Sequence, residues 1–173
     1  MVAALRELRL GSEALRRRRR AMALRVYAEP SVFGGCEDEE FREGSRRLLQ
    51  RFGTGRVHLV ISGLTLRELT PAPLEVRRWL VEVPRSAVEF LHFTAQARRL
   101  QRAYEDAGLV TPRLRADAHH IALATAGRVD YLVSWNFKHI VNHRRIALIH
   151  ALHLRVGGPS LRICSPLELL IHV

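Results

Sequence analysis

Three acidic and two polar side chains lie close to the ends of apolar runs or helical segments, where a ligand site can form. Glu29 closes one apolar run, Glu68 lies on a short helical stretch after a second run, and Asp117 opens an alanine-rich helical segment. Ser134 and Asn136 follow a third run. Oxygen donors of this kind suit Mg²⁺ or Mn²⁺, and clustered carboxylates need a cation to offset their repulsion. These residues therefore predict a divalent-metal site of the kind that assists phosphodiester hydrolysis.

The elements that must position these side chains alternate between strands and helices. Apolar runs predict strands at 24–28, 57–61, 131–134 and 161–164. Helical spacing predicts helices at 38–52, 64–69, 74–80, 88–107, 117–126 and 146–154, with a short last helix opened by Pro166. This alternation predicts an α/β fold with a parallel sheet covered on both faces. Ligands of such folds lie outside the carboxyl ends of the strands, which brings the candidate residues to one edge.

Length and composition narrow the class of protein. The chain has 173 residues, of which 47% are hydrophobic and 26% charged, as expected for one globular domain. No apolar run is long enough to predict a membrane span. The two cysteines, Cys36 and Cys164, are too few for a disulfide framework or a four-cysteine zinc module. Their use fits a reducing compartment, so we expect a cytoplasmic protein.

The charge balance favours a polyanionic partner. The net charge is +11, and Lys138 is the only lysine among 28 basic residues. Such a surface attracts phosphate backbones through electrostatics and counterion release. Arginines are dense at residues 1–20, so we expect 1–21 to be a poorly ordered basic extension, with Met22 as the natural start and 22–173 as the domain. A basic arm that binds RNA is the alternative for this extension.

Four segments together resemble the motifs of PIN-domain proteins, and the likeness is strongest to the bacterial VapC-like group. The segments are Val-Tyr-Ala-Glu-Pro-Ser-Val-Phe-Gly-Gly (26–35), Ile-Ser-Gly-Leu-Thr-Leu-Arg-Glu-Leu (61–69), Asp-Ala-His-His-Ile-Ala-Leu-Ala-Thr (117–125) and Val-Asp-Tyr-Leu-Val-Ser-Trp-Asn-Phe-Lys-His-Ile-Val-Asn (129–142). The resemblance covers roughly residues 24–171 and implies a three-layer α/β/α fold with a central parallel sheet. It also implies a Mg²⁺- or Mn²⁺-dependent endoribonuclease, commonly the toxin of a toxin–antitoxin pair. The implied partners are an RNA substrate, a small antitoxin protein and a second copy of the chain in a homodimer.

The resemblance assigns a role to each candidate residue. Its first, second and third acids match Glu29, Glu68 and Asp117, and the fourth, usually acidic, position is Asn136. The hydroxyl two residues before that position is Ser134, and a further hydroxyl after the first acid is Ser31. The implied metal ligands are Glu29, Glu68, Asp117 and Asn136, with Ser134 as an additional catalytic residue.

Three positions depart from the pattern of the group. Glu29 stands where Asp is usual, Pro30 where Thr is common, and Asn136 keeps an oxygen ligand but loses a charge. Three carboxylates suffice to hold one divalent ion, whereas a second ion would be held weakly. The alternative function is a nucleic-acid-binding PIN-like module with weak or no catalysis. Metal-dependent cleavage distinguishes the two.

Other residues able to do chemistry have simpler interpretations. Two pairs of histidines could do chemistry: His119 with His120, and His139 with His143. We expect His119 and His120 to lie in the core or on the surface. The second pair has the spacing of zinc ligands on a helix but lacks a third ligand, so we do not expect a zinc site there. Trp135 and Phe137 flank Asn136 and are interpreted as packing residues, with base stacking as the alternative.

Overall fold

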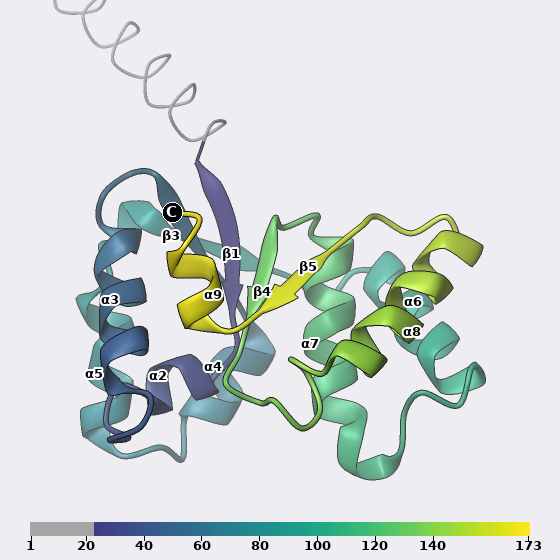
Figure 1. Ribbon diagram of the computed structural model, residues 1–173, viewed down its shortest axis with the longest axis horizontal. Coiled ribbons are helices and arrows are strands. Elements are labelled where there is room, and N and C mark those ends of the chain that lie inside the picture. The colour runs from purple at the N-terminus through teal and green to yellow at the C-terminus, as the bar shows by residue number, and fades with distance from the viewer. Residues whose placement is uncertain (1–22) are drawn as a thin grey trace, which may run out of the picture.

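Five apolar segments form one parallel sheet in the computed structural model, which describes residues 23–173. The strand order is β3-β2-β1-β4-β5, so the first strand is central (Figure 1). The strands are β1 (Leu24–Ala28), β2 (Val57–Ser62), β3 (Val88–Leu91), β4 (Tyr131–Val133) and β5 (Arg162–Cys164). All four neighbouring pairs are parallel. The predicted N-terminal extension, residues 1–21, lies outside the described residues, so the domain boundary at residue 22 stays a prediction.

Helices cover both faces of this sheet and make three layers (Figure 1). One group packs on one face and comprises α2 (Ser31–Gly34), α3 (Arg42–Phe52), α5 (Leu74–Glu82) and α9 (Pro166–Leu170). The other group comprises α4 (Gly63–Leu69), α6 (Ala95–Asp106), α7 (Arg115–Ala126) and α8 (His143–Arg155). Short 3₁₀ turns cover Arg85–Ala87 and Pro112–Leu114. The predicted three-layer α/β/α architecture is confirmed. Among residues 23–173, the structure has no helix of the length and apolarity needed to cross a membrane.

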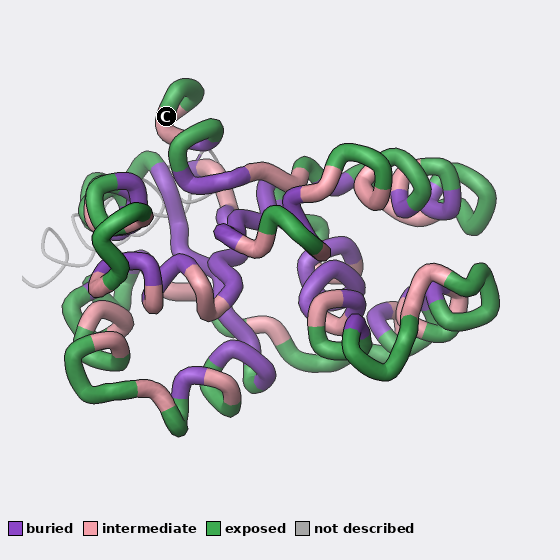
Figure 2. Tube along the Cα trace, turned by 60° about the horizontal axis from the view of Figure 1, so that its bottom comes forward, coloured by how far each residue is buried: buried purple, intermediate pink, exposed green. Residues whose placement is uncertain are grey.

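Each face of the sheet has its own hydrophobic core. Successive side chains of a strand point to opposite faces, so Val26 and Ala28 enter one core and Tyr27 enters the other. On β4, Leu132 lies opposite Tyr131 and Val133 in the same way. Burial on both faces explains why the central strands are continuous apolar runs, and Figure 2 shows them as a buried band between exposed helix surfaces.

The register of the central strands aligns their carboxyl ends. Tyr27 pairs with Val60 of β2, and Ala28 pairs with Val133 of β4. The residues that come directly after these strands therefore emerge at one edge of the sheet. That edge is where the sequence predicts the metal site.

One predicted helix is wrong in its first part. Residues 88–107 do not form a single helix: Val88–Leu91 form edge strand β3, and α6 begins only at Ala95. The hydroxyl of Thr94 accepts a hydrogen bond from the Ala97 amide and caps α6. Apolar residues of the short edge strand happen to fit helical spacing, which hides the boundary.

A second predicted helix begins later than expected. The expected start at residue 38 is replaced by a turn, in which the Asp38 carboxylate accepts a hydrogen bond from the Glu40 amide at 2.9 Å. Helix α3 then starts at Arg42. The short helix α2, which begins directly after Pro30, was not predicted.

Candidate metal centre

Glu29 is the best-anchored acid of the predicted site. Its backbone amide extends the β1–β4 ladder by donating to the Val133 carbonyl at 3.1 Å, which fixes the start of the side chain. The residue is only 9% exposed. Burying a carboxylate is costly unless hydrogen bonds compensate. Three groups donate to its Oε2 atom: the Ser134 hydroxyl at 2.7 Å, the Ser31 amide at 3.2 Å and the Ser31 hydroxyl.

The two serines that hold Glu29 are themselves held by backbone. The Ser134 hydroxyl accepts from the Asn136 amide at 2.9 Å, and the Ser31 hydroxyl accepts from the Trp135 amide, also at 2.9 Å. Each hydroxyl can therefore use its own proton to donate a hydrogen bond to Glu29. Within residues 23–173 these side-chain bonds all reach Oε2, which leaves the Oε1 lone pairs of Glu29 for another partner.

Glu68 is oriented by a buried histidine. The His120 Nε2 atom lies 3.1 Å from Glu68 Oε2, and the His120 Nδ1 atom lies 2.8 Å from the Tyr27 hydroxyl. With Tyr27 donating to Nδ1, the Nε2–H donates to the carboxylate and both ring nitrogens are satisfied. The His120 side chain is 1% exposed, whereas that of Glu68 is 32% exposed. The hydrogen bond from His120 lowers the pKa of Glu68 and keeps this carboxylate ionised.

Tyr27 is held from the far side. Its hydroxyl lies 2.7 Å from the Ser62 hydroxyl and 3.2 Å from the Thr65 hydroxyl. Burial raises the pKa of Tyr27 to about 12, so the phenol keeps its proton and can donate it to His120. A continuous chain of hydrogen bonds thus runs from the start of α4 through Tyr27 and His120 to Glu68.

Asp117 is paired with the residue at the fourth position of the motif. The Asn136 Nδ2 atom donates to Asp117 Oδ1 at 3.2 Å, and the Asn136 Oδ1 atom accepts from the His139 amide at 3.0 Å. Because the backbone amide can only donate, the amide oxygen of Asn136 must face His139. Burial raises the pKa of Asp117, the charge of Glu29 adds to that rise, and His139 opposes it. Asn136 therefore meets Asp117 as a neutral donor.

The structure brings the predicted residues to one edge in three linked groups. Glu29 contacts Ser134 and Ser31, Glu68 contacts His120, and Asp117 contacts Asn136. One ligand atom from each of Glu29, Glu68 and His120 lies within 4.8 Å of the others. Asp117 is not in this group of three, but the Glu29 charge acts on it. The donors come from the residue directly after β1, from α4 and α7, and from the segment after β4.

The donor set suits a hard divalent cation. Carboxylate oxygens dominate it, and they match the preference of Mg²⁺ and Mn²⁺. The sequence interpretation placed His120 in the core or on the surface and missed its role in orienting Glu68. His120 is in the core, yet its Nε2 atom reaches the carboxylates. Its place three residues after Asp117, on the same side of a helix, is the signal that could have shown this.

The remaining candidates from the sequence are the second histidine pair and the two aromatic residues that flank Asn136. His143 starts α8 and His139 precedes it, so the two do not share a helix face. Across residues 23–173, no second cluster of three histidine, cysteine, aspartate or glutamate ligands is close enough to hold a metal. Trp135 is 7% exposed, its Nε1 atom donates to the Ser45 hydroxyl at 2.8 Å, and its ring stacks on Phe41 at 4.6 Å. The packing interpretation is thus confirmed for Trp135, whereas it is wrong for Phe137, which is 49% exposed.

The Trp135 ring sits where α3 has no side chain. A Cβ atom at Gly44 would lie 2.9 Å from the Trp135 ring, which is closer than van der Waals contact allows. Gly44 therefore permits the close approach of this ring to the helix. Since Trp135 immediately precedes Asn136, this packing fixes the segment that carries Ser134 and Asn136.

Comparison with known proteins supports the fold. No protein-family model matches the chain, and no curated protein matches it in sequence. Five solved chains match it in structure. One belongs to the crystal structure of VapBC2 from Rickettsia felis bound to a DNA fragment from their promoter, with a TM-score of 0.52 and 16% sequence identity. The match covers 82% of this chain and 98% of that chain.

The comparison defines a class of fold. A parallel sheet in three layers, matched over nearly the whole of a VapBC2 chain, is a PIN-like α/β/α fold. The likeness to the VapC-like group, predicted from four sequence segments, is thus confirmed at the level of the fold.

Proposed function

We propose that this protein is a metal-dependent endoribonuclease that hydrolyses RNA phosphodiester bonds. The observation that carries the proposal is that carboxylate oxygens of Glu29 and Glu68 lie within 4.8 Å of each other at the carboxyl edge of the sheet, and that the Glu29 charge acts on Asp117. The PIN-like fold of the chain supports the same class. Acidic groups so placed are costly for the folded state unless a cation joins them.

The residues of this site have distinct tasks in the proposed reaction. Glu29, Glu68 and Asp117 would hold Mg²⁺ or Mn²⁺, and the lone pair of Asn136 Oδ1 that does not accept from the His139 amide would be available as a neutral ligand. A cation bound there supplies an acidified water and offsets the charge of the scissile phosphate. Ser134 and Ser31 keep Glu29 in one orientation by donating to Oε2.

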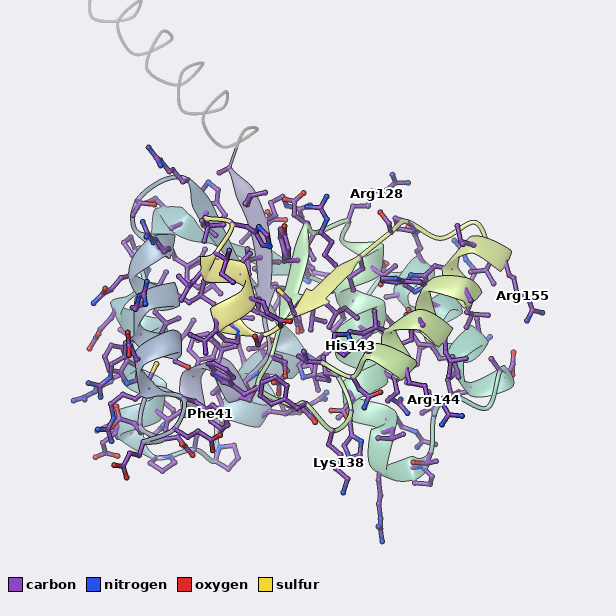
Figure 3. The ribbon with its side chains drawn as sticks, viewed as in Figure 1. Phe41, Arg128, Lys138, His143, Arg144 and Arg155 are labelled. Carbon is purple, nitrogen blue, oxygen red and sulfur yellow. The ribbon has the colours of Figure 1, made fainter. Side chains whose placement is uncertain are left out.

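Exposed cations of the chain are suited to hold the RNA backbone. Lys138, in the loop after β4, and Arg155, at the end of α8, project away from the ribbon in Figure 3. Lys138 lies two residues after Asn136 in the chain. Cationic side chains around an anionic metal site allow a polyanion to approach it despite the carboxylates.

We further infer that the protein acts in the cytoplasm as the toxin of a toxin–antitoxin pair, with a small antitoxin as partner and a homodimer as its assembly. The support is the fold match to the structure of VapBC2 bound to a DNA fragment from their promoter. Co-expression with the product of the neighbouring gene, followed by co-purification, tests the antitoxin contact. Sedimentation tests the homodimer.

RNA cleavage measured with Mg²⁺, Mn²⁺ or a chelator tests the activity. Asp117→Asn should lose most cleavage, because it removes one of three charges while the new amide can still accept from Asn136. RNA binding should survive in this variant, since the arginines remain. Asp106→Asn is the matched control: it removes an exposed aspartate at the end of α6 and should cleave normally.

Two results would count against this function. Equal cleavage by the wild type in chelator, or full activity of Asp117→Asn, would rule out the metal-dependent mechanism. The second candidate is a nucleic-acid-binding module, favoured by the loss of charge at Asn136. RNA binding without cleavage under any metal would establish it instead.

A further inference from the structure

A cluster of exposed rings lies at the end of edge strand β3 and directly after it. Phe90 is 42% exposed and Phe93 is 39% exposed, and His92 between them is also exposed. The Phe90 and His92 rings lie edge to face at 5.0 Å, and the Phe93 ring lies 4.4 Å from the ring of His119. Large apolar side chains gathered on a surface usually mark an interaction site.

This ring cluster (Phe90, His92, Phe93 and His119) borders the candidate metal centre. Strand β3 runs parallel to β2 and pairs Leu91 with Ser62, so the residues that follow it emerge at the same edge as the carboxylates. His119 is two residues after Asp117 on α7.

Contacts tie the cluster to the helix that carries Glu68. A Cβ atom at Gly63, the first residue of α4, would lie 3.8 Å from the Phe90 ring. The charge of Glu68 also acts on His119. The rings therefore lie next to the helix that carries Glu68.

Cations accompany these rings. The Arg98 guanidinium lies 5.6 Å from the centre of the Phe93 ring. Arg67, one residue before Glu68, is exposed and acts electrostatically on His119. A purely apolar protein contact would not need these charges, whereas a nucleic-acid strand presents both flat bases and phosphates.

We propose that Phe93 and His119, supported by Phe90 and Arg98, stack an unpaired base of an RNA substrate beside the scissile phosphate. The proposal deepens the endoribonuclease function and rests on it: it names single-stranded RNA as the substrate class. Bases within a duplex are already stacked on their neighbours, so their faces cannot reach these rings. The phosphate next to the stacked base is then directed to the carboxylates.

Binding without metal tests the stacking separately from catalysis. Fluorescence anisotropy in EDTA compares a labelled single-stranded RNA with the same sequence as a duplex. Phe93→Ala should weaken single-strand binding by about 5- to 100-fold, the effect of losing one stacked base, and leave duplex binding unchanged. Phe93→Trp should retain binding. Leu154→Ala, at a residue of α8 that is 85% exposed, is the control and should bind like the wild type.

A spectroscopic readout identifies the contact itself. An RNA that carries 2-aminopurine should lose fluorescence on binding the wild type and Phe93→Trp, but not on binding Phe93→Ala. Melting temperatures close to that of the wild type are expected for these variants, because Phe93 is exposed.

The possible outcomes separate this proposal from the one on which it rests. Unchanged single-strand binding by Phe93→Ala, or an equal loss for single strand and duplex, overturns the stacking while wild-type cleavage with Mn²⁺ still supports the nuclease. Single-strand binding that depends on Phe93, without wild-type cleavage under any metal, supports the stacking and refutes the nuclease. A change in sedimentation or antitoxin binding with no change in RNA binding would assign the rings to a protein partner and overturn the proposal.

Discussion

Asn136→Asp restores an acid at the fourth position of the site and makes the protein depend on metal for its stability. The wild-type amide nitrogen donates to Asp117 at 3.2 Å, while its oxygen accepts from the His139 amide. An aspartate can still accept the hydrogen bond from the His139 amide, but it cannot donate to Asp117. Its other oxygen would face the Asp117 carboxylate across the distance that the hydrogen bond now spans.

The size of the effect follows from that distance. Two unit charges 3.2 Å apart repel by about 5 kcal/mol at an effective dielectric constant of 20, and by about 1 kcal/mol in bulk water. Both residues are half-buried, so we expect an intermediate cost of about 2–3 kcal/mol without metal. For a domain of this size, such a cost lowers the melting temperature by about 4–10 °C. A divalent cation attracts both carboxylates, so the affinity of the variant for the cation should exceed that of the wild type by about tenfold or more.

Calorimetric melting in EDTA and in excess Mn²⁺ or Mg²⁺ measures both effects. Asn136→Asp should melt below the wild type in EDTA and gain more than the wild type when metal is added. Asn142→Asp is the matched control, since Asn142 caps α8 and aspartate caps a helix equally well. It adds the same charge without facing Asp117. If Asn136→Asp melts like the wild type in EDTA and gains nothing extra from metal, the metal-centre reasoning is wrong.

Three further predictions address other parts of the structure. His120→Ala should weaken Mn²⁺ binding, measured calorimetrically, by about 10- to 100-fold through loss of the bond that orients Glu68, and should have little added effect in a Glu68→Gln background. Gly44→Ala should destabilise the domain by about 1–3 kcal/mol in urea unfolding, whereas Gly34→Ala, whose Cβ would meet nothing within 4 Å, should not. Burial lowers the pKa of His153 to about 4, so the wild type should lose up to about 3 kcal/mol of stability as the pH falls from 6.5 to 4, because the unfolded chain takes up a proton that the native state refuses. His153→Gln should show less of this loss, and an unchanged pH dependence would contradict the assignment.

The central part of the fold could be predicted from local signals. Buried strands β1, β2 and β4 are apolar runs with clear turn residues at their ends, and the strand-and-helix alternation indicates the parallel sheet. Strand β3 could not be separated from α6 in this way, because it is short, lies at the sheet edge and carries apolar residues at spacings that also fit a helix. Only the cap at Thr94 marks the boundary.

The candidate site could be located from the sequence but not resolved. The rule that ligands lie at the carboxyl ends of parallel strands placed Glu29, Glu68 and Asp117 together. The direction of His120 could not be predicted, because α7 is buried around most of its circumference and its periodicity does not show which side faces which partner. The orientation of the Asn136 amide likewise depends on the His139 backbone, a contact made only after the chain has folded.

The central position of β1 has a consequence for the order in which the protein becomes active. The bond between Ser134 and Glu29 joins residues 105 positions apart, and the Ala28–Val133 strand pairing closes the same long loop. Long loops cost entropy before their contacts compensate for it, so we expect this closure to come late in folding. A nascent chain that has emerged only as far as β4 lacks Ser134 and Asn136, and its Glu29 has no fixed orientation. Under the proposed function, cleavage activity would appear only once synthesis has passed β4, and not progressively as the chain grows.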